Sequence, residues 1–439
     1  MSNTVLEFSV AAIIVCLVVL LSTQMRSAFA IFAVFLPLVM WLPRILFRFG
    51  PVELGEHLGI APSVAGISGW SIVLIIGLIA VLVRQTLPPF TLAWVLPIGF
   101  LLFAYTFWWP HNDNVTSGVM HWILALCAWV VGHYCGRFID ITGVLGLRMA
   151  QLFAVIFAVE LAVSLFQLAT GGGNLGRMTG MYTHPGFLGK AVVVCMVVML
   201  PLTLSRRTMT RRWAFAAVAM SVAATGLTLS RTNIIAALLI IVVWSLFLPG
   251  TRSLGSRLAM PLLAALVVLP MAGLVLDRFA EDPEGGSRPR LLEAGLRVLE
   301  KNLMMGLGPN GFVDGASPTE PVIKQLGFPV HNTFILGAAE LGVFGALLVA
   351  LPLLVVLITA FVRFGDKDPT KAAFARSVII VGGALLFVGY TSWGVLQIPS
   401  LDLIFFLFGF AFAQLMKPKP NDLGNEAVFR PANALATFR

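Results

Sequence analysis

The sequence predicts an all-α integral membrane protein, a polytopic bundle of 12–13 transmembrane helices with one larger external loop. Of its 439 residues, 59% are hydrophobic and only 11% are charged, and the mean hydropathy is +0.94. Soluble domains carry about a quarter charged residues, so this composition excludes an ordinary soluble fold. The apolar runs are continuous and about twenty residues long, the length of a membrane-crossing helix, whereas a membrane β-barrel has short alternating segments.

The apolar runs give the predicted helices in chain order. We expect spans at 5–23, 29–47, 67–84, 89–107, 119–136, 148–169, 186–204, 213–229, 232–248, 258–276, 332–362, 376–395 and 400–416. The run 29–47 contains Pro37 and Pro43 and ends near Arg44, so the count is twelve if this run does not cross. The first run lacks a basic start and an A-x-A site, and we expect it to be a retained span and not a signal peptide.

Basic residues in short loops predict the orientation, because Lys and Arg gather on the cytoplasmic side of a membrane. They occur in 205–212, 249–257, 363–376 and the tail after Met416. The parity of the spans then places three segments outside: 170–185, the Ser230–Thr232 turn and 277–331. We expect residues 1–416 to form a single transmembrane domain and residues 417–439 a flexible cytoplasmic tail.

Charge and cysteine content argue against a nucleic-acid-binding protein and against a fold held by disulfides. The net charge of +9 follows from the basic loops, and no basic, aromatic-interleaved face indicates a nucleic-acid partner. The four cysteines lie in or at the ends of apolar runs, without a C-x-x-C pair, and are expected to be small buried hydrophobes. They are Cys16, Cys127, Cys135 and Cys195.

The external loop at about 277–331 is too short to bury a core of its own. Its stretch from Leu291 to Leu303 has a helical apolar rhythm, with Glu293, Arg297 and Lys301 on the opposite side. We expect a short amphipathic helix that lies on the membrane or on the bundle.

Polar groups stand where this loop meets the apolar run 332–362. His331 and Asn332 lie at its start, and histidine is the side chain that can accept or donate a proton near neutral pH. The alternative role for His331 is to cap or line the helix start. Glu340 lies inside the apolar run, where an ionisable group marks a functional site by default. The alternatives for Glu340 are a helix-anchoring ion pair or a neutral buried acid.

Four arginines are expected on the outer side, against the orientation bias. They are Arg177, Arg231, Arg288 and Arg290. A guanidinium binds phosphate oxygens in a bidentate manner and stays charged at any relevant pH, so arginines that converge outside the membrane suit a diphosphate. For each one the alternative is an exposed residue or a lipid-headgroup contact. No metal-ligand spacing occurs in an external loop, so we expect neither a metal nor another cofactor.

Three of these features occur in the order seen in the O-antigen ligase and polymerase-like superfamily. Ser230-Arg231 opens an apolar span, Arg290 begins the stretch that leads to Gly306-Leu307-Gly308-Pro309-Asn310-Gly311-Phe312, and His331-Asn332 precede Gly342 and Gly345. The sequence resembles that superfamily over about residues 170–360.

The resemblance implies a GT-C type membrane glycosyltransferase. Such an enzyme takes a glycan from a polyprenyl (undecaprenyl) diphosphate donor and transfers it to an outward-facing glycan or lipid A-core acceptor, as an O-antigen ligase, a repeat-unit polymerase or a protein O-glycosyltransferase. It implies His331 as general base and Arg177, Arg231 and Arg290 as diphosphate ligands, with Arg288, Asn332 and Glu340 as further substrate-binding candidates. The implied location is the bacterial cytoplasmic (inner) membrane, with the active site facing the periplasm or the cell exterior.

Two alternatives belong to other classes. A flippase for lipid-linked sugars would also be all-helical, but it would be expected to place polar groups near mid-membrane and to show repeats between its halves. A scaffold without catalysis would leave the outward arginines unexplained. The clustering of polar groups at the outer side favours the enzyme.

Overall fold

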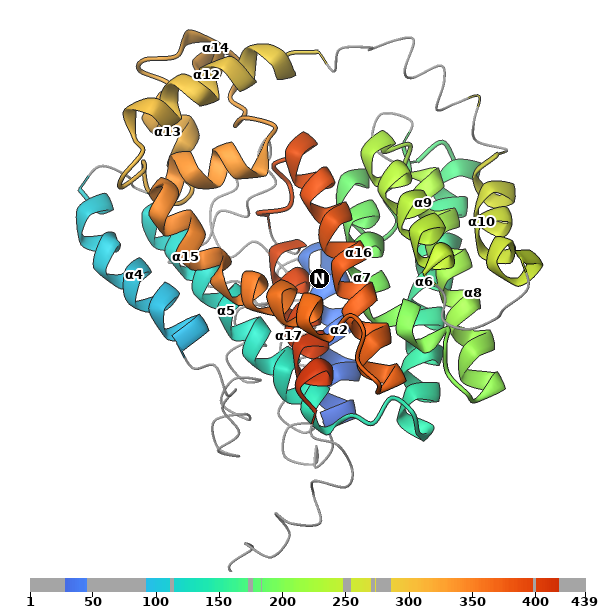
Figure 1. Cartoon of the computed structure of the whole chain (residues 1–439). Helices are drawn as coiled ribbons and strands as arrows, with labels where there is room; N and C mark the ends of the chain where they lie inside the picture. The colour runs from blue at the N-terminus through green and yellow to red at the C-terminus, as the bar shows by residue number, and fades with distance from the viewer. Residues whose placement is uncertain are drawn as a thin grey trace, which may run out of the picture.

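The computed structural model describes residues 28–45, 92–110, 114–172, 177–182, 184–247, 254–269, 273, 286–397 and 400–417. Within these residues every regular element is a helix, which confirms the all-α fold class (Figure 1). The spans expected at 5–23 and 67–84, and the tail from 418 onward, lie outside the described residues.

The long helices follow the predicted spans within five residues at each end, except that α16 begins seven residues before its predicted start and α10 ends eight residues before its predicted end. They are α2 (Ala28–Ile45), α4 (Leu92–Trp108), α5 (Val115–Phe138), α6 (Val144–Ala169), α7 (Pro185–Leu202), α8 (Thr208–Leu227), α9 (Arg231–Leu246), α10 (Leu254–Val268), α15 (Thr333–Arg363), α16 (Pro369–Thr391) and α17 (Ser400–Met416). Five of the described helices are long and apolar enough to cross a membrane, and four shorter apolar helices accompany them. The chain is therefore a multi-pass membrane protein, while the count of 12–13 spans stays a prediction.

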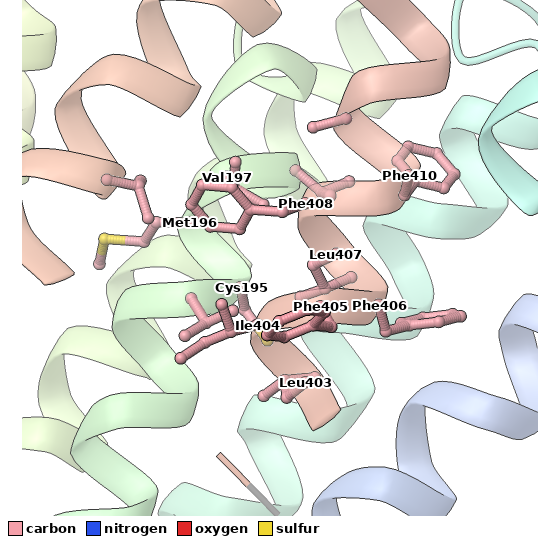
Figure 2. Packing of buried hydrophobic residues seen from close by; sticks show 14 of the residues in the cluster. Cys195, Met196, Val197, Leu403, Ile404, Phe405, Phe406, Leu407, Phe408 and Phe410 are labelled. Carbon is pink, nitrogen blue, oxygen red and sulfur yellow. The ribbon is translucent and has the colours of Figure 1, made fainter. Parts of the chain in front are cut away.

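Helices α5, α7 and α17 form the centre of the bundle. Gly132 and Gly409 let α5 and α17 approach so closely that a Cβ on either glycine would strike a carbonyl of the other helix. Figure 2 shows Cys195 and Val197 of α7 beside the phenylalanines of α17. Every residue of α7 is buried, so any polar group on this helix faces protein and not lipid. The described cysteines Cys127, Cys135 and Cys195 are free and buried, as expected.

Helix α15 is broken near its start. Gly342 has φ 72° and ψ 161°, a left-handed value that glycine alone adopts without strain, and a Cβ there would strike the Met304 carbonyl. Thirty-one residues of straight helix would extend about 46 Å against a hydrocarbon core of about 30 Å, so a bend at the membrane surface fits the length. In Figure 1 the first part of α15 runs in a different direction from the rest. The single span predicted at 332–362 is thus two segments.

Backbone groups of the external loop form hydrogen bonds with the backbone groups of α15 that this break leaves without helical partners. Leu307 N donates to the Ala339 carbonyl at 2.9 Å, Gly308 N to the Glu340 carbonyl at 2.8 Å, and Val343 N donates to the Leu303 carbonyl at 2.9 Å. A broken helix leaves backbone groups without partners, and these bonds satisfy them. The glycine-rich loop after Leu303 is therefore a structural part of the α15 bend.

The predicted amphipathic helix is present as α12 (Arg288–Lys301), and two short helices, α13 (Phe312–Ala316) and α14 (Pro321–Leu326), follow it without having been predicted. The buried face of α12 packs against α14 and the first part of α15, so this layer lies on the bundle. Arg297 and Glu320 join α12 to the residue before α14 through two hydrogen bonds of 3.1 and 2.8 Å. Figure 1 shows α12, α13 and α14 together at one end of the molecule.

The loops alternate between the two ends of the bundle as the charge pattern predicts. At one end Arg376 donates to the Phe247 carbonyl at 3.4 Å. At the other end Met178 N donates to the Leu227 carbonyl at 3.3 Å, and the Thr232 and Thr391 hydroxyls are 3.1 Å apart. The structure thus separates 205–212 and 363–376 from 177–182, 228–232 and 286–332, and we call the second group the outer end.

Impermeant thiol reagents test which end faces the cell exterior. In a background without the native cysteines, Thr319→Cys in the external layer should label in intact cells, because this residue is exposed at the outer end. Thr208→Cys, exposed at the opposite end, should label only after the membrane is opened. The reverse pattern would overturn the orientation derived from the basic loops.

Candidate functional site

The N-termini of three helices meet at the outer end. Helix α7 begins after His184, α9 after Ser230 and α15 after Asn332. The Asn233 amide joins the first two, because it donates to the Gly186 carbonyl at 3.2 Å and to the Ser230 hydroxyl at 2.9 Å. Helix N-termini carry partial positive charge and unpaired N–H groups, so their convergence favours an anion.

The segment 177–182 is held by polar side chains of α6. Gln167 accepts hydrogen bonds from Thr179 N at 2.9 Å and Gly180 N at 3.1 Å, and buried Glu160 accepts one from Met181 N at 2.9 Å. Arg177, at the start of this segment, donates through Nε to the Thr228 carbonyl at 3.1 Å. These contacts bring Arg177 to the turn that precedes Arg231.

Lys190 is the residue that the sequence analysis missed. It lies in the second turn of α7, only 4% of its surface is exposed, and its ammonium is 5.1 Å from the centre of the Phe187 ring. In the part of the chain that the structure describes, no carboxylate pairs with Lys190, and Arg177 lies close enough to interact with it electrostatically. A lone ionisable residue in an apolar run marks a functional site by default, and that signal could have found it.

His331 lies directly before Asn332, the N-cap of α15, and is partly buried. Burial lowers the pKa of His331 to about 4, and the positive charges of Arg288 and Lys190 add to this effect. A hydrogen bond to the Pro329 carbonyl acts on the pKa in the opposite direction. The imidazole is therefore uncharged at neutral pH, and a neutral imidazole can accept a proton.

The turn after α16 forms a further wall that the sequence did not indicate. The Trp393 ring stands edge-on to His331, with the ring centres 6.5 Å apart. Gly394 leaves room for Lys190, because a Cβ at this glycine would collide with the ammonium and would lie 3.2 Å from the Gln397 amide oxygen. Thr333 fastens the turn to α15 by donating to the Ser392 carbonyl at 2.5 Å. One short segment thus contacts both His331 and Lys190.

Only one of the two arginines of the external layer interacts with these site residues. Arg288 and Arg290 are exposed at the start of α12. Arg288 is near enough to lower the pKa of His331, whereas no such interaction joins Arg290 to the other site residues in the described part of the chain. Arg231 is the first residue of α9 and is partly exposed. We call Arg177, Lys190, Arg231, Arg288 and His331 the outer basic cluster.

Asn332 and Glu340 occupy structural positions. The Asn332 side chain accepts hydrogen bonds from Phe334 N at 3.0 Å and Ile335 N at 3.1 Å, and so caps α15. Glu340 accepts from Phe312 N at 3.4 Å, at the start of α13. Both side chains hold the frame of the site, and the structure gives neither a contact with the outer basic cluster. Their expected role in substrate binding remains a prediction.

Comparisons with known proteins cover part of the chain that carries this cluster. Residues 215–350 match the family described as O-antigen ligase, Wzy_C. A further match is the exopolysaccharide production protein ExoQ of Rhizobium meliloti, 32% identical over 143 residues. That match covers 28% of this chain and 30% of the relative. The family match contains Arg231, Arg288, Arg290 and His331, while Arg177, Lys190 and Trp393 lie outside it. Across residues 215–350 the chain is thus similar to the O-antigen ligases, and the resemblance to the O-antigen ligase and polymerase-like superfamily is confirmed.

Proposed function

We propose that this protein is a membrane glycosyltransferase that moves a glycan from a polyprenyl (undecaprenyl) diphosphate to an outward-facing acceptor, as an O-antigen ligase or a repeat-unit polymerase. The observation that carries the proposal is the buried amine of Lys190, which no carboxylate pairs within the described residues, beside the neutral imidazole of His331. A bound anion would stabilise the charged form of Lys190, and the His331 imidazole can take a proton. The similarity to the O-antigen ligase family supports the same reaction class.

The outer basic cluster suits a diphosphate leaving group. Charge develops on the bridging oxygen as the sugar departs, and fixed cations stabilise it without a metal. Arg177 and Arg231 belong to the bundle and Arg288 to the external layer. Arg290, also on α12, is a further proposed ligand of the diphosphate. We propose a metal-independent reaction, in which the basic side chains take the place of a divalent cation at the diphosphate.

His331 is proposed as the general base. A sugar hydroxyl is a weak nucleophile, and an imidazole within hydrogen-bond reach removes its proton as the new bond forms. A bound diphosphate would raise the pKa of His331 from its low value, because negative charge favours the imidazolium. The base is thus neutral before the donor binds and becomes stronger afterwards.

The position of the cluster favours this function over transport. The cluster lies where helices begin and where the external layer rests, at one end of the bundle. A flippase would be expected to place such groups near the membrane centre. We propose the bacterial inner membrane as the location, with the cluster facing the periplasm.

Replacement of Lys190 separates binding from folding. In Lys190→Met a similar volume replaces a buried charge, so thermal stability should stay the same or rise. Affinity for the diphosphate donor should fall about 10- to 100-fold, the worth of one or two charge-assisted contacts. Lys371→Met changes a buried lysine at the opposite end and should leave donor affinity unchanged. Unaltered donor affinity in Lys190→Met would remove this residue from the site.

Arg231→Lys tests the bidentate contact. An ammonium keeps the charge but cannot place two N–H groups on one phosphate, so transfer should fall by about tenfold or more. Arg231→Ala should be worse, with near-normal expression. Arg206→Lys, exposed at the other end, is the matched control. Full activity in Arg231→Ala would contradict a role in binding.

His331→Gln tests the base. The variant should fold normally yet lose transfer by about two to four orders of magnitude, the usual worth of general acid–base catalysis. The assay is transfer of a polyprenyl-diphosphate glycan in liposomes, with and without a chelator. Near-parent turnover would leave His331 as a structural residue, and loss of parent activity on chelation would refute the metal-free mechanism.

The pH profiles of the parent should also reflect this base. A base works deprotonated, so rate is lost as pH falls through its pKa. The kcat/KM for the donor should fall only near pH 4, because it reports the free enzyme, in which the pKa of His331 is about 4. The kcat should fall at a higher pH, because the bound diphosphate raises that pKa. If kcat and kcat/KM fell at the same pH, His331 would not be the general base.

A further inference from the structure

We propose that His184 is a neutral hydrogen-bond donor to the departing diphosphate, acting through Nε2–H in a tautomer that the N-terminus of α7 selects. This inference rests on the function proposed above. It concerns a histidine that lies outside the family match, 147 positions before His331.

The local backbone determines the tautomer. His184 is the N-cap of α7, with extended dihedrals, and its Nδ1 accepts a hydrogen bond from Gly186 N at 3.0 Å. A ring nitrogen that accepts such a bond carries no proton, so the proton of the neutral ring is on Nε2. The Phe187 ring stands edge-on to the imidazole, with the centres 5.9 Å apart, and fixes its orientation.

The neighbouring charges keep this ring neutral. Burial lowers the pKa of His184 to about 4, and the positive charges of Lys190 and Arg177 lower it further. Protonation of Nδ1 would also break the bond from Gly186 N. At working pH the side chain therefore offers one donor of known position and adds no third positive charge beside the other two.

His184 and the buried Lys190 amine both lie beside one glycine. A Cβ at Gly186 would lie 3.1 Å from Nδ1 of His184 and 3.4 Å from Nζ of Lys190. Lys190 is buried without a carboxylate partner in the described residues, so an anion bound here would stabilise its charged form. Although the protein encloses part of the ring, His184 keeps exposed surface at the end of the helix, and within the described chain its Nε2 makes no hydrogen bond. Nε2–H is therefore left for a ligand, and the inference is that an anion bound at Lys190 accepts it.

In the proposed reaction the acceptor oxygen bonds to the anomeric carbon, and the bond from that carbon to the phosphate oxygen breaks. The electron pair of the broken bond stays on the diphosphate, and the acceptor proton passes to His331. His184 keeps its own proton and donates a hydrogen bond to a phosphate oxygen, which strengthens as negative charge grows there.

Binding of inorganic pyrophosphate to the full-length protein in detergent, measured by calorimetry, tests the inference. His184→Ser retains a capping oxygen for Gly186 N but removes the Nε2 donor. We expect unchanged thermal stability and a dissociation constant about 10- to 100-fold higher, the usual range for a hydrogen bond to a charged group. Asp368→Ser, which exchanges the N-cap of α16 at the opposite end, is the matched control and should bind as the parent does.

Parent-like pyrophosphate affinity in His184→Ser would overturn the inference. If the serine variant does not fold, the ¹⁵N-histidine spectrum of the parent decides, with the signal assigned through His184→Asn. Its protonated Nε2 resonance should shift when pyrophosphate saturates the protein, and an unmoved resonance would refute the contact. Pyrophosphate binding includes no transfer step, so failure of His331 as the general base would leave this result intact. A parent that binds no pyrophosphate would instead refute the donor class.

Discussion

The ammonium of Lys190 lies inside the bundle, on a helix that has no lipid-facing side. Moving an ion out of water costs several kcal/mol unless an opposite charge or well-placed dipoles replace the water. Here the Phe187 ring and the turn after α16 surround the charge, and Arg177 adds a like charge nearby. The outer end is therefore arranged for an anionic ligand, and the low pKa of His331 follows in part from the same concentration of positive charge.

The external layer and the bundle depend on each other at the α15 break. The loop after α12 supplies the backbone partners that the bend requires, and Glu340 holds the start of α13. This mutual bonding fixes the direction of the first part of α15, which carries Asn332 at its cap and His331 just before it. A residue that acts on a substrate is thus oriented by a loop that has no need to touch the substrate.

Hydropathy predicted the helices well, because a bilayer requires continuous apolar runs of nearly fixed length. His331 and Arg231 were also visible, since each is a polar residue at the edge of such a run. The bend at Gly342 could not be predicted from the sequence, because a glycine within an apolar run leaves the hydropathy of that run unchanged. Nor could the sequence bring Lys190 and Trp393 together, because they are about 200 positions apart and belong to no periodic pattern. Asn332 and Glu340 share the motif of His331, but their bonds to backbone N–H groups depend on the folded chain.

The complete burial of α7 has a consequence for the order of assembly. Its neighbours include α16 and α17, and the Ser377 hydroxyl of α16 donates to the Val197 carbonyl of α7 at 2.8 Å. Those two helices are synthesised almost 200 residues after α7, so during translation one side of α7 has no final partner. Until α16 and α17 are inserted, α7 with its Lys190 must be held by the translocon or pack against temporary neighbours. The most buried of the described helices is therefore enclosed last, when the C-terminal helices arrive.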